Sequence, residues 1–167
     1  MNIKLMAILL MLLPSASYAA VDMFLDIEGV PGETQDGDHL GEIDVLAWSW
    51  GASSTGNITC VQDVSITKHV DLASPELLMG QVENRAYNTA TLTVRKAGAT
   101  PLEFVVIKFN NVYVSSYFTG ASGGEDRLTE KVTLNFQSAE YIYTSQDATG
   151  VADGVKSATI YPSGRCK

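Results

Sequence analysis

The sequence has few of the side chains on which most enzyme mechanisms depend. Its 167 residues include two histidines, His39 and His69, and two cysteines, Cys60 and Cys166. A zinc site needs three or four ligands at suitable spacing, and neither CxxC nor HExxH occurs. The sequence therefore predicts no metal centre and no Cys/His catalytic pair, and each histidine is expected to be structural or on the surface.

Positive charge is also scarce. The chain has 11 Lys and Arg against 19 Asp and Glu, which gives a formal net charge of −8 at pH 7. Such an acidic chain repels phosphate backbones, so we expect no nucleic-acid partner.

Long apolar runs are missing except near the N-terminus. Leu5–Leu13 is uniformly apolar, follows Lys4, and precedes small residues at Ser17 and Ala19. That order is typical of a secretory signal peptide, and the run is too short to cross a bilayer, which needs about 20 residues. A buried N-terminal strand or anchor is the alternative.

Cleavage after Ala19 would divide the chain into a signal peptide at 1–19 and a single domain at 20–167. We expect no membrane insertion afterwards, and a secreted or periplasmic location. In an oxidising compartment Cys60 and Cys166 are expected to form a disulfide, which contributes about 4.7 kcal/mol in the loop-entropy model before strain. A bridge between subunits and two free thiols are the alternatives.

Alternation of apolar and polar residues with period two dominates the rest of the chain. In the segment 21–28, Met23, Leu25 and Ile27 share one face. The segment 42–51 has apolar side chains on both faces, as a strand covered on both sides would. Further strand-like runs occur at 61–68, 90–96, 102–109, 112–118, 131–139, 141–144 and 155–161, and a polar loop is expected at 52–59.

One segment has helical spacing instead. Ser74-Pro75-Glu76 is typical of an N-cap, a first-turn proline and an early carboxylate, and the helix is expected to end before Asn84. The fold class predicted is therefore mainly β: a small β-barrel or sandwich of two sheets with one short α-helix on its side.

Two pairs of carboxylates are candidates for catalytic groups, but neither is expected to act in catalysis. Glu125-Asp126 and Asp36/Asp38 could act as acid and base on a sugar, but adjacent strand residues point to opposite faces and turn acids are usually solvated. The glycine-rich segment 120–124 lacks the Lys-Ser/Thr and helix of a phosphate loop. The sequence predicts no catalytic residue and no cofactor.

A charged turn stands out near the start of a strand. It contains Glu125, Asp126, Arg127, Glu130 and Lys131. We interpret it as a salt-bridged turn that sets strand register or forms a subunit edge.

Several strands also carry polar residues where contact with a neighbouring subunit is expected. These are Thr93, Arg95, Lys108, Ser115, Ser116, Thr133 and Asn135.

Several segments, in order, carry a resemblance to a known family. They are Met23-Phe24-Leu25 with Ile27, His39, EIDVLAWSWG at 42–51, VQD at 61–63 with Thr67-Lys68, Asp71 with SPELLM at 74–79, TLTVRKAG at 91–98, and GGEDRLTE at 123–130 continuing to Phe136. The combination resembles the Hcp family, the tube protein of the bacterial type VI secretion system.

The resemblance implies a small β-barrel whose copies form hexameric rings head to tail. The rings stack into a tube that a contractile sheath drives out of the cell, and the lumen can carry effector proteins. The implied function is a structural ring-forming tube subunit or effector carrier, and not an enzyme.

Three features depart from the family pattern. They are the signal-like leader, the short segment 52–59 where relatives have a longer loop that contacts the next ring, and the tail from Ser145 onward. They leave a second hypothesis beside the first: an exported Hcp-like protein of the periplasm or cell surface that binds or assembles outside the injection machine.

Overall fold

The computed structural model describes residues 21–56, 58–98, 100–124 and 126–162. The predicted signal peptide at 1–19 and Cys166 lie outside these residues, so both stay predictions. The elements follow one another as β1 Val21–Ile27, β2 Ile43–Ser49, β3 Ala52–Thr55, β4 Ile58–Val61, β5 Val64–His69, α1 Ser74–Val82, β6 Ala86–Lys96, β7 Leu102–Thr119, β8 Thr129–Gln146 and β9 Ala152–Ile160.

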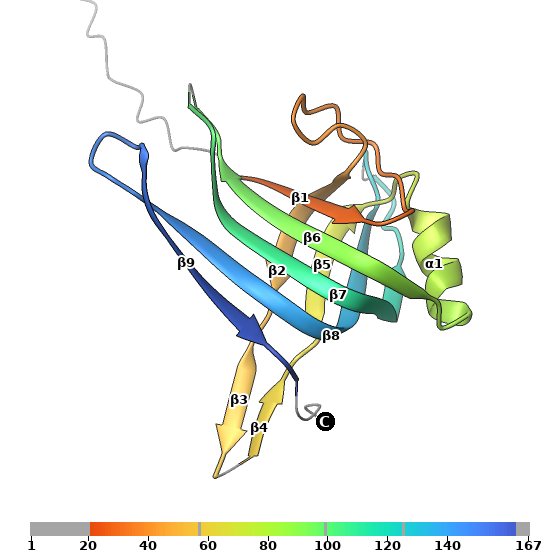
Figure 1. The fold of residues 1–167 in the computed structure, drawn as a ribbon. Coiled ribbons are helices and arrows are strands. Elements are labelled where there is room, and N and C mark those ends of the chain that lie inside the picture. Colours follow the sequence, from red (N-terminus) through yellow and green to blue (C-terminus); the bar gives the residue numbers. More distant parts are fainter. Residues whose placement is uncertain (1–20, 57, 99, 125, 163–167) are drawn as a thin grey trace, which may run out of the picture.

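The strands form a closed barrel with one additional strand. The large sheet has the order β5-β2-β1-β6-β7-β8-β9, and a further pairing between β5 and β8 closes six of these strands on themselves. The first part of β8 pairs with β5, and its second part pairs with β9, which lies outside the barrel (Figure 1). The prediction of a mainly β fold with one short helix is confirmed.

Two pairs of predicted strands prove to be single long strands. The runs 102–109 and 112–118 belong to β7, and 131–139 and 141–144 belong to β8. Asn111, at the break predicted in β7, adopts φ of 50°, a left-handed conformation that asparagine tolerates better than most residues. Both strands therefore continue through the positions where the sequence suggested that they ended.

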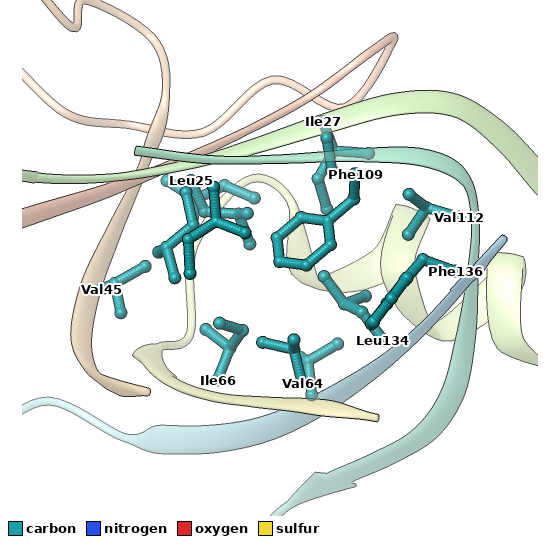
Figure 2. Packing of buried hydrophobic residues seen from close by; sticks show 14 of the residues in the cluster. Leu25, Ile27, Val45, Val64, Ile66, Phe109, Val112, Leu134 and Phe136 are labelled. Carbon is teal, nitrogen blue, oxygen red and sulfur yellow. The ribbon is translucent and has the colours of Figure 1, made fainter. Parts of the chain in front are cut away.

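The barrel interior is filled with apolar side chains from every wall. Leu25 and Ile27 of β1 face Val64 and Ile66 of β5, as Figure 2 shows. Strict alternation on a strand puts one face toward this core, so the predicted inward face of β1 is correct for these two residues.

Aromatic rings fill one end of this core. The rings of Phe109 and Phe136 lie 5.0 Å apart, and Trp50 meets both edge-on at 5.9 and 5.5 Å. Offset and edge-on contacts of this kind are favourable beyond the area they bury.

The expectation that both faces of β2 are covered is wrong. Ile43 and Val45 are buried, but Leu46 on the outer face is 42% exposed. A register shift between Val45 and Ala47 marks a bulge, which breaks the alternation and re-aims the following side chains.

The expected polar loop at 52–59 is also wrong. Its residues form most of a β-hairpin, in which β3 and β4 pair from Ala52 opposite Val61 to Thr55 opposite Ile58. Gly56 supplies the positive φ of 60° that a tight hairpin turn requires. The hairpin projects away from the barrel (Figure 1).

The helix begins differently from the prediction. Ala73 and not Ser74 is the N-cap, and no side chain caps it. The Asp71 carboxylate instead accepts a hydrogen bond from the Ala73 N–H at 2.9 Å. Farther along, a Cβ on Gly80 would lie 2.0 Å from the Tyr87 hydroxyl, so only glycine allows α1 to pack this closely against β6.

Candidate functional site

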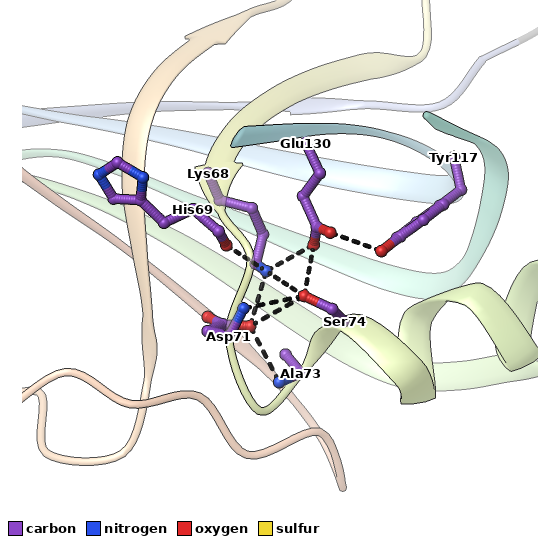
Figure 3. A network of polar contacts seen from close by, with 7 residues as sticks. All are labelled: Lys68, His69, Asp71, Ala73, Ser74, Tyr117 and Glu130. Atoms are coloured by element: carbon purple, nitrogen blue, oxygen red, sulfur yellow. Dashed lines mark hydrogen bonds and ion pairs between the residues drawn. The ribbon is translucent and has the colours of Figure 1, made fainter. Parts of the chain in front are cut away.

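A buried cluster of polar side chains joins β5, β8 and the start of α1 (Figure 3). Its centre is Lys68, the last core-facing residue of β5, whose side chain is completely buried. The Lys68 ammonium lies 2.6 Å from the Glu130 carboxylate and 2.6 Å from the Asp71 carboxylate. One buried cation therefore neutralises parts of two carboxylates at the seam where the barrel closes.

Hydrogen bonds join further polar atoms of this cluster. Lys68 also donates to the His69 carbonyl at 2.8 Å, and the Ser74 hydroxyl donates to Glu130 at 2.9 Å. The Tyr117 hydroxyl donates to the second oxygen of Glu130. Burial, reinforced by this hydrogen bond, raises the pKa of Tyr117 to about 12, so the hydroxyl remains a donor at neutral pH.

This cluster is suited to holding the fold together and not to catalysis. Its cation and carboxylates contact one another within the barrel wall, where no substrate reaches the completely buried Lys68 and Glu130 side chains. Such a group costs desolvation energy and is stable only when every partner is present. We call Lys68, Asp71, Ser74, Tyr117 and Glu130 the seam network.

A second polar cluster lies on the outer side of β1 and β6. Arg95 forms a two-pronged contact with Asp36, with one Nη–Oδ distance of 2.9 Å, and a second pairing with Asp22 at 3.2 Å. Its guanidinium lies 5.0 Å from the centre of the Phe24 ring, and His39 stacks on that ring at 4.0 Å. Arg95 is buried, so its expected availability to a neighbouring subunit is wrong, and Thr93 is buried as well.

The charge of Arg95 favours the ionised state of the Asp36 carboxylate in this second cluster. The hydrogen bonds from Arg95 lower the pKa of Asp36 to about 2, against an ordinary value of 3.8. The same contact raises the pKa of Arg95 above its usual value. A carboxylate held charged in this way cannot donate a proton near neutral pH, which agrees with the rejection of Asp36 as a catalytic acid.

The structure separates the members of the predicted charged turn. Glu130 points into the barrel wall as part of the seam network, whereas Asp126, Arg127 and Lys131 are exposed. Glu125 lies outside the described residues. The predicted cluster is therefore not one group of side chains, and the assembly role of its exposed members stays a prediction.

Sequence reasoning did not single out most of the seam network. It missed Lys68, Asp71, Ser74 as a Glu130 partner, and Tyr117. One signal was present, because Lys68 follows Val64 and Ile66 on the same face of β5, which marks it as facing the core.

Two further properties of the described residues bear on function. In the part of the chain that the structure describes, no group of three or more His, Cys, Asp or Glu side chains could hold a metal ion. Nor does any described helix combine the length and apolar character needed to cross a membrane.

Comparison with known proteins decides the family. The sequence model described as "Type VI secretion system effector, Hcp" matches residues 24–143, which is more than half of the chain. The chain belongs to the Hcp family. The matched span of this Hcp protein contains the whole seam network but ends within β8, so β9 and the C-terminal tail lie beyond it.

Relatives and solved structures agree with this assignment. The Hcp protein is 47% identical over 146 residues to Protein hcp1 of Pseudomonas aeruginosa, covering 81% of this chain and 90% of that protein. Hcp1 of Salmonella typhimurium has the same fold, with a TM-score of 0.74 at 29% identity over 85% of this chain and 94% of that one. A type VI secretion system effector from Yersinia pestis gives a TM-score of 0.74 at 32% identity, covering 84% and 99%.

Proposed function

We propose that this protein is a secreted tube subunit of a type VI secretion system and that its copies assemble into rings. The observation that carries the proposal is the extent of the likeness, since the alignment spans 90% of the Pseudomonas aeruginosa protein. The family is not known for enzymes, and the ionisable side chains of the seam network are buried in a structural role. Hexameric closure, stacking of rings and carriage of effector proteins in the lumen follow from the resemblance.

The surface of α1 supports contact between copies. Leu78, Met79 and Val82 are all exposed on this nine-residue helix. Scattered exposed apolar residues are ordinary, but three within so short a segment form an apolar face that favours burial against a partner. A neighbouring copy in the ring is the partner we propose.

The projecting hairpin supports contact between rings. It follows the Trp-Ser-Trp-Gly segment, where the resemblance implies a loop that contacts the next ring. Paired strands hold a projecting segment more rigidly than a loop would, because their backbone groups are hydrogen-bonded to each other. We therefore assign stacking to β3 and β4 in spite of their short length.

The exposed part of the charged turn is proposed to set ring register. Arg127 is exposed beside Asp126, and within the residues that the structure describes it forms no ion pair. Exposed charges contribute little to folding but can orient a contact and disfavour a wrong one.

Mass photometry of the purified domain at 20–167 tests this function. We expect a species of ring size at micromolar concentration, and the variant Arg127→Glu should shift the population toward monomers without changing the melting temperature. Lys156→Glu, an exposed charge reversal on β9, is the matched control. A wild-type protein that stays monomeric would contradict the tube function, whereas equal rings for both variants would contradict only the role of the turn.

A further inference from the structure

The hairpin of β3 and β4 joins the barrel through an interruption in both of its strands. Residues 50–51 lie between the end of β2 and the start of β3, and residues 62–63 lie between the end of β4 and the start of β5. We call these residues the hairpin root. Residues at the ends of elements are the usual place for a hinge, because they absorb changes of backbone angle. The hairpin could therefore change direction here unless side chains hold the root.

The hydrogen bonds within the root join its two strands to each other. The Gln62 N–H donates to the Gly51 carbonyl at 2.9 Å, and the Trp50 indole donates to the Gln62 carbonyl at 2.9 Å. Both bonds would move together with the hairpin. The barrel holds the first strand of the root through the Trp50 ring, which meets the rings of Phe109 and Phe136 edge-on at 5.9 and 5.5 Å.

Asp63 attaches the second strand of the root to the barrel wall. One oxygen of its carboxylate accepts a hydrogen bond from the Ser115 hydroxyl of β7 at 2.6 Å, and the other accepts one from the Asn135 amide of β8 at 2.7 Å. Hydrogen bonds to an ionised carboxylate are stronger than those between neutral groups. Ser115 lies at the register shift between β7 and β8, and a bulge of this kind re-aims a side chain.

We propose that Asp63 is a positioning residue, which together with Trp50 fixes the direction in which the hairpin projects and so allows rings to stack. Two attachments, one on each strand of the root, prevent rotation about either attachment alone. A segment that is already oriented loses less conformational freedom on binding, so its contact with a partner is stronger. Asp63 thus acts through the hairpin. The part of the proposal that concerns stacking rests on the proposed function.

Time-resolved fluorescence anisotropy of the domain at 20–167 measures how far the hairpin swings. A dye is attached to the variant Ser54→Cys, an exposed position of β3, after both native cysteines have been replaced by serine. In this background Asp63→Ala should lose at least about twice as much anisotropy through local motion as the parent protein. Asp26→Ala, which removes an exposed carboxylate from β1, is the matched control and should behave like the parent.

Two further variants connect the swing to the hydrogen bonds themselves. Ser115→Ala removes one of the two donors and should give an intermediate loss of anisotropy. The exchange of Asp63→Asn combined with Asn135→Asp again places a carboxylate opposite an amide, and it should restore most of the parent anisotropy. A general loss of stability would not be reversed by this exchange, so the pair of variants separates positioning from a merely structural role.

Electron microscopy of the assembled protein tests the consequence for stacking. Asp63→Ala should form rings as the wild type does, but the fraction of stacked rings should fall at least about fivefold because the hairpin is no longer preoriented. Asp26→Ala should stack normally, and the exchanged pair should recover stacking.

The proposal is overturned by any of three results. Equal anisotropy for Asp63→Ala and the parent would show that the carboxylate does not hold the hairpin. An exchanged pair as loose as Asp63→Ala would show that the hydrogen bonds are not the cause. A loose hairpin with undiminished stacking would show that its direction does not matter for assembly. A wild-type protein that forms rings and never stacks them would contradict the stacking role in the proposed function, whereas the anisotropy result does not depend on assembly.

Discussion

Replacing Lys68 by methionine tests the central energetic claim about the seam network. Methionine keeps much of the side-chain volume but removes the cation that lies 2.6 Å from both the Glu130 and Asp71 carboxylates. Two carboxylates then remain in the barrel wall without a cation. Removing one partner of a buried ion pair lowers the free energy of unfolding by about 3–5 kcal/mol. Because Lys68→Met leaves two carboxylates without a cation, we expect its loss of stability to lie near the upper end of that range.

The charges of the network predict an order among variants. One cation and two carboxylates give the native network a formal charge of −1, Lys68→Met makes it −2, and Glu130→Gln makes it neutral. Glu130→Gln should therefore lower the free energy of unfolding clearly less than Lys68→Met does, although both substitutions remove the same ion pair. Lys131→Met, at the exposed neighbouring position, should change stability little.

Urea unfolding of the domain at 20–167 measures these differences. The midpoint should fall for Lys68→Met with an unchanged slope, and the melting temperature should fall by roughly 6–20 °C. A Lys68→Met protein within about 1 kcal/mol of the wild type would refute the buried-pair reasoning. A Glu130→Gln protein less stable than Lys68→Met would refute the role of net charge.

Two further predictions concern acid stability and packing. Because the pKa of Asp36 is about 2 in the folded chain against 3.8 ordinarily, its pairing with Arg95 stabilises the fold above about pH 4, and this contribution is lost as the pH falls toward 2. Asp36→Asn should flatten acid unfolding in that window, and an unchanged acid transition would contradict the pairing. Gly32→Ala should lower the melting temperature because the new Cβ would lie 2.2 Å from the Glu42 carbonyl oxygen. Gly37→Ala is the control, since its Cβ would meet no atom within 4 Å and should leave the melting temperature unchanged. Equal melting temperatures for the two variants would count against the close contact.

Local sequence patterns predicted the structural features that depend only on residues close together in the chain. Alternation identified the strands and the inward face of β1, since a strand with one buried face must place every second side chain in the core. The same pattern places Lys68 in line with Val64 and Ile66. The hairpin at 52–61 had no comparable signal, because serine and threonine occupy both of its faces and no core lies beneath it.

The cap of the helix shows where local reasoning stops. Ser74 has the sequence context of an N-cap, but its hydroxyl is turned to Glu130, which is 56 positions away. The hydroxyl that would cap the helix is engaged in this buried contact, and Ala73 is the N-cap instead.

Composition and short-range periodicity are sufficient to predict a mainly β domain with a single short helix and few catalytic side chains. They do not predict that Lys68 and Glu130, 62 positions apart, meet at the seam while Arg127 and Lys131 stay exposed. The reason is that β5 and β8 become neighbours only when the barrel closes, and closure turns one face of each strand inward and the other toward solvent.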